Sequence, residues 1–173
     1  MKKKVRLISL NLNERDLSIA LVGLKQYAEL NKKVKSNFDI HIHQWNKNYA
    51  NMGNPNTIEG LGLDEIIESL DPLNTDIFGF STYIWNFDFM MKISKKVKNI
   101  NPSTVNIFGG SQAGGMGGKL FSLGEHIDYL ISGEAELSFR KFLLGYLDND
   151  YSDVENLTFR SKGELTQNIP DDK

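Results

Sequence analysis

The stretch "DIFGFSTYIWN", residues 76–86, changes character halfway along its length. Residues 76–81 form an apolar run of the length expected for a strand that is buried on both faces. Two hydroxyl residues, a tyrosine and a tryptophan follow where the strand should give way to a turn: Ser81, Thr82, Tyr83 and Trp85. Hydroxyl and aromatic side chains at the exit of a buried strand raise the question of what they contact there.

Similar apolar runs recur along the chain and alternate with helical patterns. Strands are predicted at residues 5–10, 38–45, 76–81, 104–110 and 127–133. Apolar residues at three- and four-residue spacing predict helices over 17–28, 63–70, a segment capped by Asn86, and 134–147, with a weaker helix near 118–124. This alternation indicates parallel crossovers. The predicted fold class is α/β, a flavodoxin-like (Rossmann-like) doubly wound sheet of five parallel strands in the order 2-1-3-4-5, in three α/β/α layers.

The chain is expected to contain one domain followed by a connector. Residues 1–150 carry all the predicted strands, while residues 46–60 are rich in Asn and Gly and predict a long loop. Residues 151–173 hold Pro170, scattered charges and no long apolar face. We expect this last segment to lie outside the sheet order, as an extended or hairpin connector.

Composition limits the classes of function. A chain of 173 residues with 40% hydrophobic content is long enough for one domain with a core, and its net charge of −2 gives no reason to expect nucleic acid or an acidic membrane as partner. The absence of cysteine excludes disulfides, a cysteine nucleophile and an iron–sulfur cluster within this chain. The first apolar run is short and interrupted, so neither an export signal nor a membrane span is predicted, and a cytoplasmic protein is expected.

The predicted topology places a ligand beyond the carboxyl ends of the strands. The loops there are residues 11–14, 81–85, 109–118 and 132–136. A dinucleotide site would need a glycine-rich turn after the first strand, and none is present. The glycines of 109–118 match neither G-x-G-x-x-G nor the P-loop pattern. The residues of a phospho-receiver or of an FMN phosphate loop are also missing, so nucleotide ligands are disfavoured.

Three motifs in this order and spacing resemble a known family. "DIFGFSTYIWN", "VNIFGGSQA" and "IDYLISGEAELSF" resemble the N-terminal cobalamin-binding domain of cobalamin-dependent radical SAM enzymes, over roughly residues 4–147. The resemblance implies a domain that holds the corrin of cobalamin over the carboxyl edge of the sheet. It also implies a partner, a radical SAM domain of the same polypeptide with a [4Fe–4S] cluster and S-adenosylmethionine. The reaction would be of methyltransferase or cyclase-like type.

The resemblance assigns cofactor-binding roles to particular residues, with no catalytic or metal-ligating residue among them. Ser81 and Thr82 would meet the nucleotide tail of cobalamin, and Tyr83 and Trp85 would border the corrin. Gly109 and Gly110 would make room for the tail. Leucine at Gly110 is expected to block the tail while leaving the fold largely intact if the residue is at the rim. The other candidates are Asn11, Leu12, Ser111, Gln112, Ser132, Gly133 and Glu134.

The chain also departs from related patterns. Residues 11–16 contain no histidine, so we expect no histidine ligand to cobalt, and no C-x-x-x-C-x-x-C is present. Two plainer interpretations of the same residues stay open, strand-end hydroxyls at Ser81 and Thr82 and a helix-start charge at Glu134. His41 and His43 share one strand face, for which a solvated polar face is favoured over a metal site. The alternative functions are a free-standing flavodoxin-like ligand-binding or sensor module, and a docking module without cobalamin.

Overall fold

A computed structural model of the chain describes residues 1–11, 17–46, 57–58 and 61–169. Its main sheet has seven strands in the order β2-β1-β5-β6-β7-β8-β9. The strands are β1 (Lys3–Asn11), β2 (Phe38–Asn46), β5 (Ile77–Ser81), β6 (Val105–Gly109), β7 (Tyr129–Ile131), β8 (Leu157–Ser161) and β9 (Glu164–Gln167). The first five are parallel and follow the predicted order 2-1-3-4-5.

The predicted count of five strands is wrong, because β8 and β9 extend the sheet. β8 pairs antiparallel with β7, and β9 pairs antiparallel with β8. Residues 157–167 do form the expected hairpin, but it continues the sheet order, so the expectation that residues 151–173 lie outside that order is wrong. The aromatic ring of Phe159 on β8 lies 5.8 Å from that of Tyr129 on β7. The hairpin thereby buries an aromatic side chain against β7, and this packing favours its position at the edge of the sheet.

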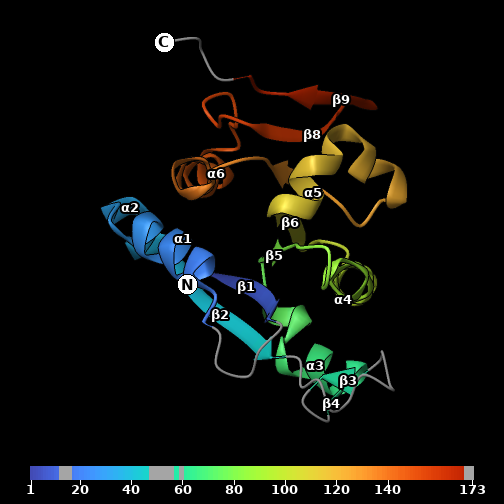
Figure 1. Cartoon of the computed structure of the whole chain (residues 1–173). Helices are drawn as coiled ribbons and strands as arrows, with labels where there is room; N and C mark the ends of the chain where they lie inside the picture. Colours follow the sequence, from blue (N-terminus) through green and yellow to red (C-terminus); the bar gives the residue numbers. More distant parts are fainter. Residues whose placement is uncertain (12–16, 47–56, 59–60, 170–173) are drawn as a thin grey trace.

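Helices cover both faces of the sheet in three layers (Figure 1). Helices α1 (Ile19–Glu29), α2 (Lys32–Asn37) and α6 (Glu136–Asp148) cover one face. Helices α3 (Leu63–Ser69), α4 (Phe87–Ile100) and α5 (Ser111–Met116) lie on the other. Short 3-10 helices occupy Pro72–Asn74 (η2) and Gly117–Leu123 (η3), and β3 (Thr57–Ile58) and β4 (Leu61–Gly62) pair separately.

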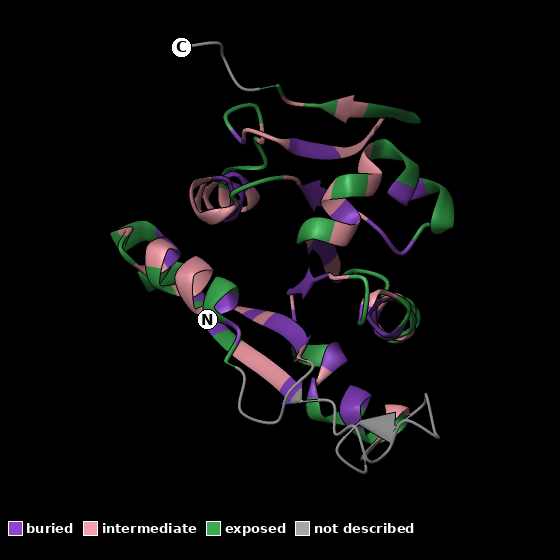
Figure 2. Ribbon diagram, viewed as in Figure 1, coloured by how far each residue is buried: buried purple, intermediate pink, exposed green. Residues whose placement is uncertain are grey.

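The alternation of side chains along β1 explains the two hydrophobic cores. Val5 and Leu7 belong to the core beneath α1 and α6. Ile8 and Leu10 belong to the core on the other face of the sheet, beneath α3 and α4. Buried residues accordingly follow the strands and the inward faces of the helices (Figure 2). Apolar runs buried on both faces are the expected signature of a parallel sheet.

Several predicted boundaries shift in the structure. The last helix begins at Glu136, not at residue 134, and Leu17 precedes α1 with 65% of its surface exposed. Asn86 stands at the N-cap position of α4, but its side chain makes no capping hydrogen bond. The weak helix near 118–124 is η3, preceded by α5 within the predicted glycine-rich loop. Most of the predicted loop 46–60 lies outside the described residues. In the described part of the chain, no helix has the length and apolarity needed to span a membrane.

Candidate functional site

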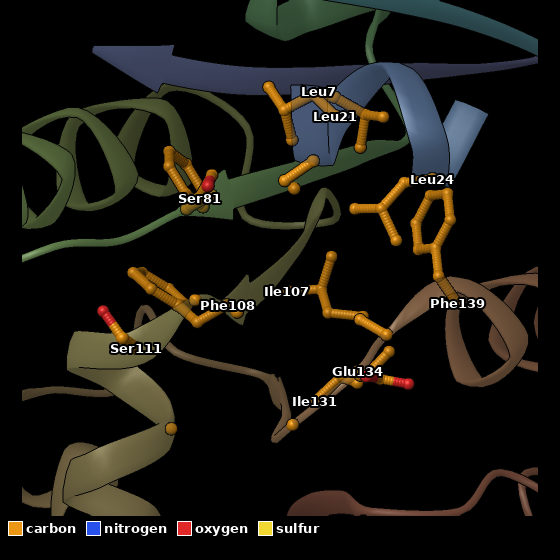
Figure 3. A pocket seen from close by; sticks show the side chains of 18 of the residues that line it. Leu7, Leu21, Leu24, Ser81, Ile107, Phe108, Ser111, Ile131, Glu134 and Phe139 are labelled. Carbon is orange, nitrogen blue, oxygen red and sulfur yellow. The ribbon is translucent and has the colours of Figure 1, made fainter. Parts of the chain in front are cut away.

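A cavity of about 540 Å³ opens at the carboxyl ends of β1, β5, β6 and β7 (Figure 3). It extends between the sheet and the helices α1 and α6, and α5 borders its mouth. Cavities of this size bind small molecules and cofactors. The lining residues come from seven elements and their loops: Leu7, Ala20, Leu21, Leu24, Gly79, Phe80, Ser81, Tyr83, Ile107, Phe108, Gly109, Gly110, Ser111, Gly114, Gly115, Ile131, Gly133, Glu134, Ala135, Glu136 and Phe139.

The inner wall of the cavity is apolar. Ile107 of β6 faces Leu24 of α1 and Phe139 of α6 across the same space in Figure 3. Leu7 of β1 covers Gly79 of β5, since a Cβ atom on Gly79 would stand 2.7 Å from the Leu7 Cδ2 atom. The missing side chain at Gly79 thus lets a neighbouring leucine lie flat against the sheet. These walls suit an apolar, flat group.

Several glycines line the mouth of the cavity, where they leave the backbone without side chains. Gly109 ends β6, Gly110 is the N-cap residue of α5, and Gly114 and Gly115 lie on α5. A Cβ atom on Gly115 would find no heavy atom within 4 Å, so its side-chain position is open space. A ligand that enters here can approach the backbone of both elements closely.

Ser81 supplies a buried hydroxyl to the wall of the cavity. The residue is 8% exposed and lies at the end of β5. Within the described ranges, no protein group forms a hydrogen bond with its Oγ atom. A buried hydroxyl without a protein partner is costly unless a ligand or water completes it.

Thr82 has a different role from its neighbour. It is fully buried and does not line the cavity. Its Oγ1 atom donates to the Gly109 carbonyl oxygen at 2.7 Å and accepts from the Ala113 amide at 3.0 Å. The hydroxyl therefore ties the ends of β5 and β6 to the start of α5, and both of its hydrogen bonds are internal to the protein.

Asn86 fixes the loop between β5 and α4, a role that the sequence pattern did not predict. Its Nδ2 atom donates to the carbonyl oxygens of Leu10 and Ser81, at 3.2 and 3.1 Å. Its Oδ1 atom accepts from the Tyr83 amide at 2.8 Å. One buried amide thus joins the ends of two strands to the loop that carries the aromatic pair. Asparagine before a helix predicts a cap, and only the tertiary structure reveals the other partners.

Tyr83 and Trp85 form a stacked pair at the sheet edge. Their ring centroids are 4.7 Å apart and the ring planes differ by 2°. The Trp85 Nε1 atom donates to the Leu10 carbonyl oxygen at 3.3 Å, which holds the pair against the end of β1. Ile84 between them is 80% exposed. Tyr83 lines the cavity, whereas Trp85 lies just outside it.

The carboxylates at the mouth come from the start of α6. Glu134 and Glu136 both line the cavity, and across the residues with described positions neither forms an ion pair. The Oε1 atom of Glu136 lies 3.5 Å from the place of a Cβ atom on Gly23 of α1. The mouth therefore offers acceptors to hydroxyl or amide groups of a ligand.

The structure brings seven of the thirteen candidate residues to the cavity: Ser81, Tyr83, Gly109, Gly110, Ser111, Gly133 and Glu134. Five more lie outside its lining: Asn11, Thr82, Trp85, Gln112 and Ser132. Leu12 is not among the described residues. The apolar lining was missed because leucines at helical spacing predict core packing equally well.

None of the three histidines lines the cavity. His41 is exposed and contacts Asp39 at 3.0 Å. Burial, with the electrostatic influence of Arg6 and His41, lowers the pKa of His43 to about 4. No group of three or more metal-binding side chains occurs among residues whose positions are described.

Residues 32–143 match the family described as the B12 binding domain. The chain belongs to the B12-binding domain family. This match covers more than half of the chain and confirms the resemblance that the three motifs indicated.

Two relatives of this B12-binding domain are methyltransferases by name. The 2-(S-pantetheinyl)-carbapenam-3-carboxylate methyltransferase of Streptantibioticus cattleyicolor is 31% identical over 97 residues, covering 55% of this chain and 14% of that protein. The cobalamin-dependent radical SAM methyltransferase TokK of Streptomyces tokunonensis is 33% identical over 87 residues, covering 49% of this chain and 13% of that protein. The chain thus corresponds to a small part of either relative.

Solved structures share the fold. OxsB, described as a cobalamin-dependent S-adenosylmethionine radical enzyme, superposes with a TM-score of 0.67 at 15% identity, covering 98% of this chain and 22% of that chain. TsrM from Kitasatospora setae, solved with cobalamin and a [4Fe–4S] cluster, superposes with a TM-score of 0.64 at 14% identity, covering 98% and 29%. Nearly the whole of this B12-binding domain therefore has a counterpart of the same fold within each of these larger enzymes.

Proposed function

We propose that this domain binds cobalamin with the nucleotide tail in the cavity and the corrin over the carboxyl edge of the sheet. The carrying observation is the apolar cavity of about 540 Å³, which opens between glycines of β6 and α5 in a chain of the B12-binding family. A corrinoid tail ends in a bulky heterocyclic base, so it needs a mostly apolar slot with an open entrance. The cavity has an apolar inner wall, and its mouth is open at Gly115.

The side chains along the cavity fit the parts of such a tail. Ser81 carries a hydroxyl with no hydrogen-bond partner among the described residues, and it suits a ring nitrogen of the base. Glu134 and Ser111 at the mouth suit the hydroxyl groups of a ribose. The stacked pair of Tyr83 and Trp85 offers a flat apolar border to the corrin. We assign edge contacts with the corrin to Asn11, Gln112 and Ser132, which lie outside the cavity lining, and a place at the mouth to Gly133.

Thr82 is reassigned from ligand contact to positioning. Its two internal hydrogen bonds hold the glycine pair Gly109–Gly110 beside the end of β5. Asn86 positions Tyr83 in the same way. These two buried residues keep the entrance in one geometry before a ligand arrives, which reduces the ordering cost of binding.

Cobalamin, when bound, supplies a cobalt centre that can carry a methyl group between a donor and an acceptor. The protein's part would be to hold the tail, and residues 11–16 would offer no imidazole to the cobalt, because they contain no histidine. We further propose that the domain serves a radical SAM methyltransferase, with the [4Fe–4S] cluster and S-adenosylmethionine held by another domain of the same polypeptide. The names of both relatives support this proposal over a cyclase-like reaction.

Retention of cobalamin tests the proposed function. The purified chain is mixed with hydroxocobalamin, desalted, and examined by absorbance for bound corrinoid. We expect close to one equivalent to stay with the protein. Complete loss of the corrinoid from folded protein would contradict the proposal and favour a docking module without cobalamin.

A further inference from the structure

The backbone acceptors at the entrance are already occupied by protein donors. The Leu10 carbonyl oxygen accepts from Asn86 and Trp85, and the Ser81 carbonyl oxygen accepts from Asn86. The Gly109 carbonyl oxygen accepts from both the amide and the hydroxyl of Thr82. Residues of the loop after β5 therefore occupy these three carbonyl groups.

Further into the α5 turn the same pattern holds. The Thr82 carbonyl oxygen accepts from the Gln112 amide at 3.2 Å. The Gly110 carbonyl oxygen accepts from the Gly114 amide at 2.9 Å. The carbonyl groups of β5, β6 and the α5 turn are therefore already hydrogen-bonded within the protein, and the uncapped start of α6 is the part of the mouth that offers backbone amides.

The side chains leave one buried polar group. Ser81 is the buried polar side chain of the lining, whereas Tyr83, Ser111, Glu134 and Glu136 are at least partly exposed at the mouth. The remaining lining side chains are apolar. A base that enters the cavity past the mouth therefore meets one buried polar side chain, and its other polar atoms are placed against mainly apolar side chains.

Cobamides differ in the base at the end of the tail, and this difference meets the cavity directly. A dimethylbenzimidazole base has one free ring nitrogen, and the rest of its surface is hydrocarbon. An adenine base has several ring nitrogens and an exocyclic amine with two donor hydrogens. Buried polar groups without partners weaken binding, so adenine is disfavoured in such a site.

We propose that the cavity selects the cobamide by its lower base, accepting apolar bases such as dimethylbenzimidazole and discriminating against adenine. This selectivity rests on the proposed function, because it requires the base to enter the cavity. The ligand class is thereby narrowed to cobamides with a benzimidazole or phenolic base.

Titrations with three cobamides test the selectivity. The unmodified chain is titrated with cobalamin, with the adeninyl cobamide and with the cresolyl cobamide, whose base lacks a ring nitrogen. We expect the adeninyl cobamide to bind at least about tenfold more weakly than cobalamin, equivalent to about 1.4 kcal/mol. The cresolyl cobamide should bind more tightly than the adeninyl cobamide, because it forgoes one hydrogen bond and buries no unpaired donor.

The outcomes separate this inference from the proposed function. If cobalamin binds and the adeninyl cobamide binds equally well, the selectivity is refuted while cobalamin binding stands. If the cresolyl cobamide is the weakest of the three, a single hydrogen bond decides the choice, and the inference is again refuted. If none of the three binds, the proposed function fails and the inference fails with it.

A polar substitution in the wall should reverse part of the preference. Leu24→Gln places an amide in the cavity from α1, at a residue that is only partly buried, and Leu24→Met is the matched apolar control. We expect Leu24→Gln to reduce the ratio of the Kd for the adeninyl cobamide to the Kd for cobalamin by at least about threefold. Leu24→Met should leave this ratio unchanged. An unchanged ratio in folded Leu24→Gln would contradict the inference. The ratio in the unmodified chain decides it independently if this variant does not fold.

Discussion

Gly110 and Thr82 are packed backbone against backbone at the entrance of the cavity. A Cβ atom on Gly110 would overlap the Thr82 carbonyl oxygen and would stand 2.8 Å from the Thr82 amide nitrogen. Gly110 also has a φ of 92°, in the left-handed region that side chains rarely adopt. The expectation that leucine would be tolerated at this position is therefore wrong. The glycine is needed by the fold before any ligand is considered.

Gly110→Ala should destabilise the domain strongly. The added methyl group meets backbone atoms that cannot move independently, and the positive φ adds strain. We expect a loss of about 2–4 kcal/mol in the free energy of unfolding. Gly109→Ala is the matched control, because its Cβ atom would lie 3.6 Å from the Ile131 carbonyl oxygen, an ordinary contact. Denaturant unfolding of both variants checks the difference, and equal stability would show that the two glycines are equivalent.

Ser81→Ala and Thr82→Val should separate binding from stability. Ser81→Ala removes a hydroxyl that no described residue uses, so the stability should change little. Its affinity for cobalamin should fall by about 0.5–1.5 kcal/mol, the value of one hydrogen bond. Thr82→Val removes two internal hydrogen bonds and should lower the free energy of unfolding by about 1–3 kcal/mol. Calorimetric titration and denaturant unfolding measure the two effects. The opposite pattern would contradict the separate roles of the two hydroxyls. In that pattern Ser81→Ala lowers the stability, and Thr82→Val lowers only the affinity for cobalamin.

His43 should make the stability depend on pH. Burial, Arg6 and His41 lower the pKa of His43 from its ordinary value of 6.5 to about 4. Between these values the unfolded chain binds a proton that the folded chain does not bind. The free energy of unfolding therefore keeps its full value, as far as His43 is concerned, above pH 6.5. It decreases by on the order of 1–3 kcal/mol as the pH falls toward 4.

The variant His43→Gln isolates this contribution. Its free energy of unfolding should decrease less than that of the unmodified chain between about pH 7 and pH 4.5. His126, whose pKa is also lowered by burial, remains in both proteins and cancels in the comparison. An equal decrease in both proteins would show that His43 is not the group responsible.

The cobalt of bound cobalamin should lack a histidine ligand. Residues 11–16 contain no histidine, and His41, His43 and His126 all lie outside the cavity lining. We expect the cob(II)alamin form to show the EPR spectrum of a base-off corrinoid without imidazole. Nitrogen superhyperfine splitting from an imidazole would contradict this geometry.

The order of the five parallel strands and the sheet edge at which the cavity opens could be predicted from the sequence. The apolar runs around 76–81 and 104–110 are long and clearly bounded, and the topology rules leave few arrangements for five parallel strands. The carboxyl ends of those strands then define one edge. Seven of the candidate residues line the cavity there because each follows a strand end.

The remaining features depend on contacts that are distant in sequence. The β8 strand "LTFRS" has too few apolar residues to predict a strand, and its pairing with β7 comes from aromatic contacts such as Phe159 with Tyr129. Leu21 and Leu24 recur as core residues would, although both also line the cavity. The separate roles of Ser81 and Thr82 depend on which of the two hydroxyl groups forms a hydrogen bond with the Gly109 carbonyl oxygen. The sequence of two adjacent hydroxyl residues at the end of a strand does not predict which one it is.

The measurement that tests the central claim most directly is the affinity of Gly115→Leu for cobalamin. Gly115 lines the mouth, and its side-chain position is open, so leucine should enter the space of the tail without disturbing the fold. Ser122→Leu, on the exposed side of η3 and outside the lining, is the matched control. We predict a Kd at least about tenfold higher for Gly115→Leu than for the unmodified chain, and no change for Ser122→Leu. Unchanged affinity in folded Gly115→Leu would show that cobalamin does not use this cavity.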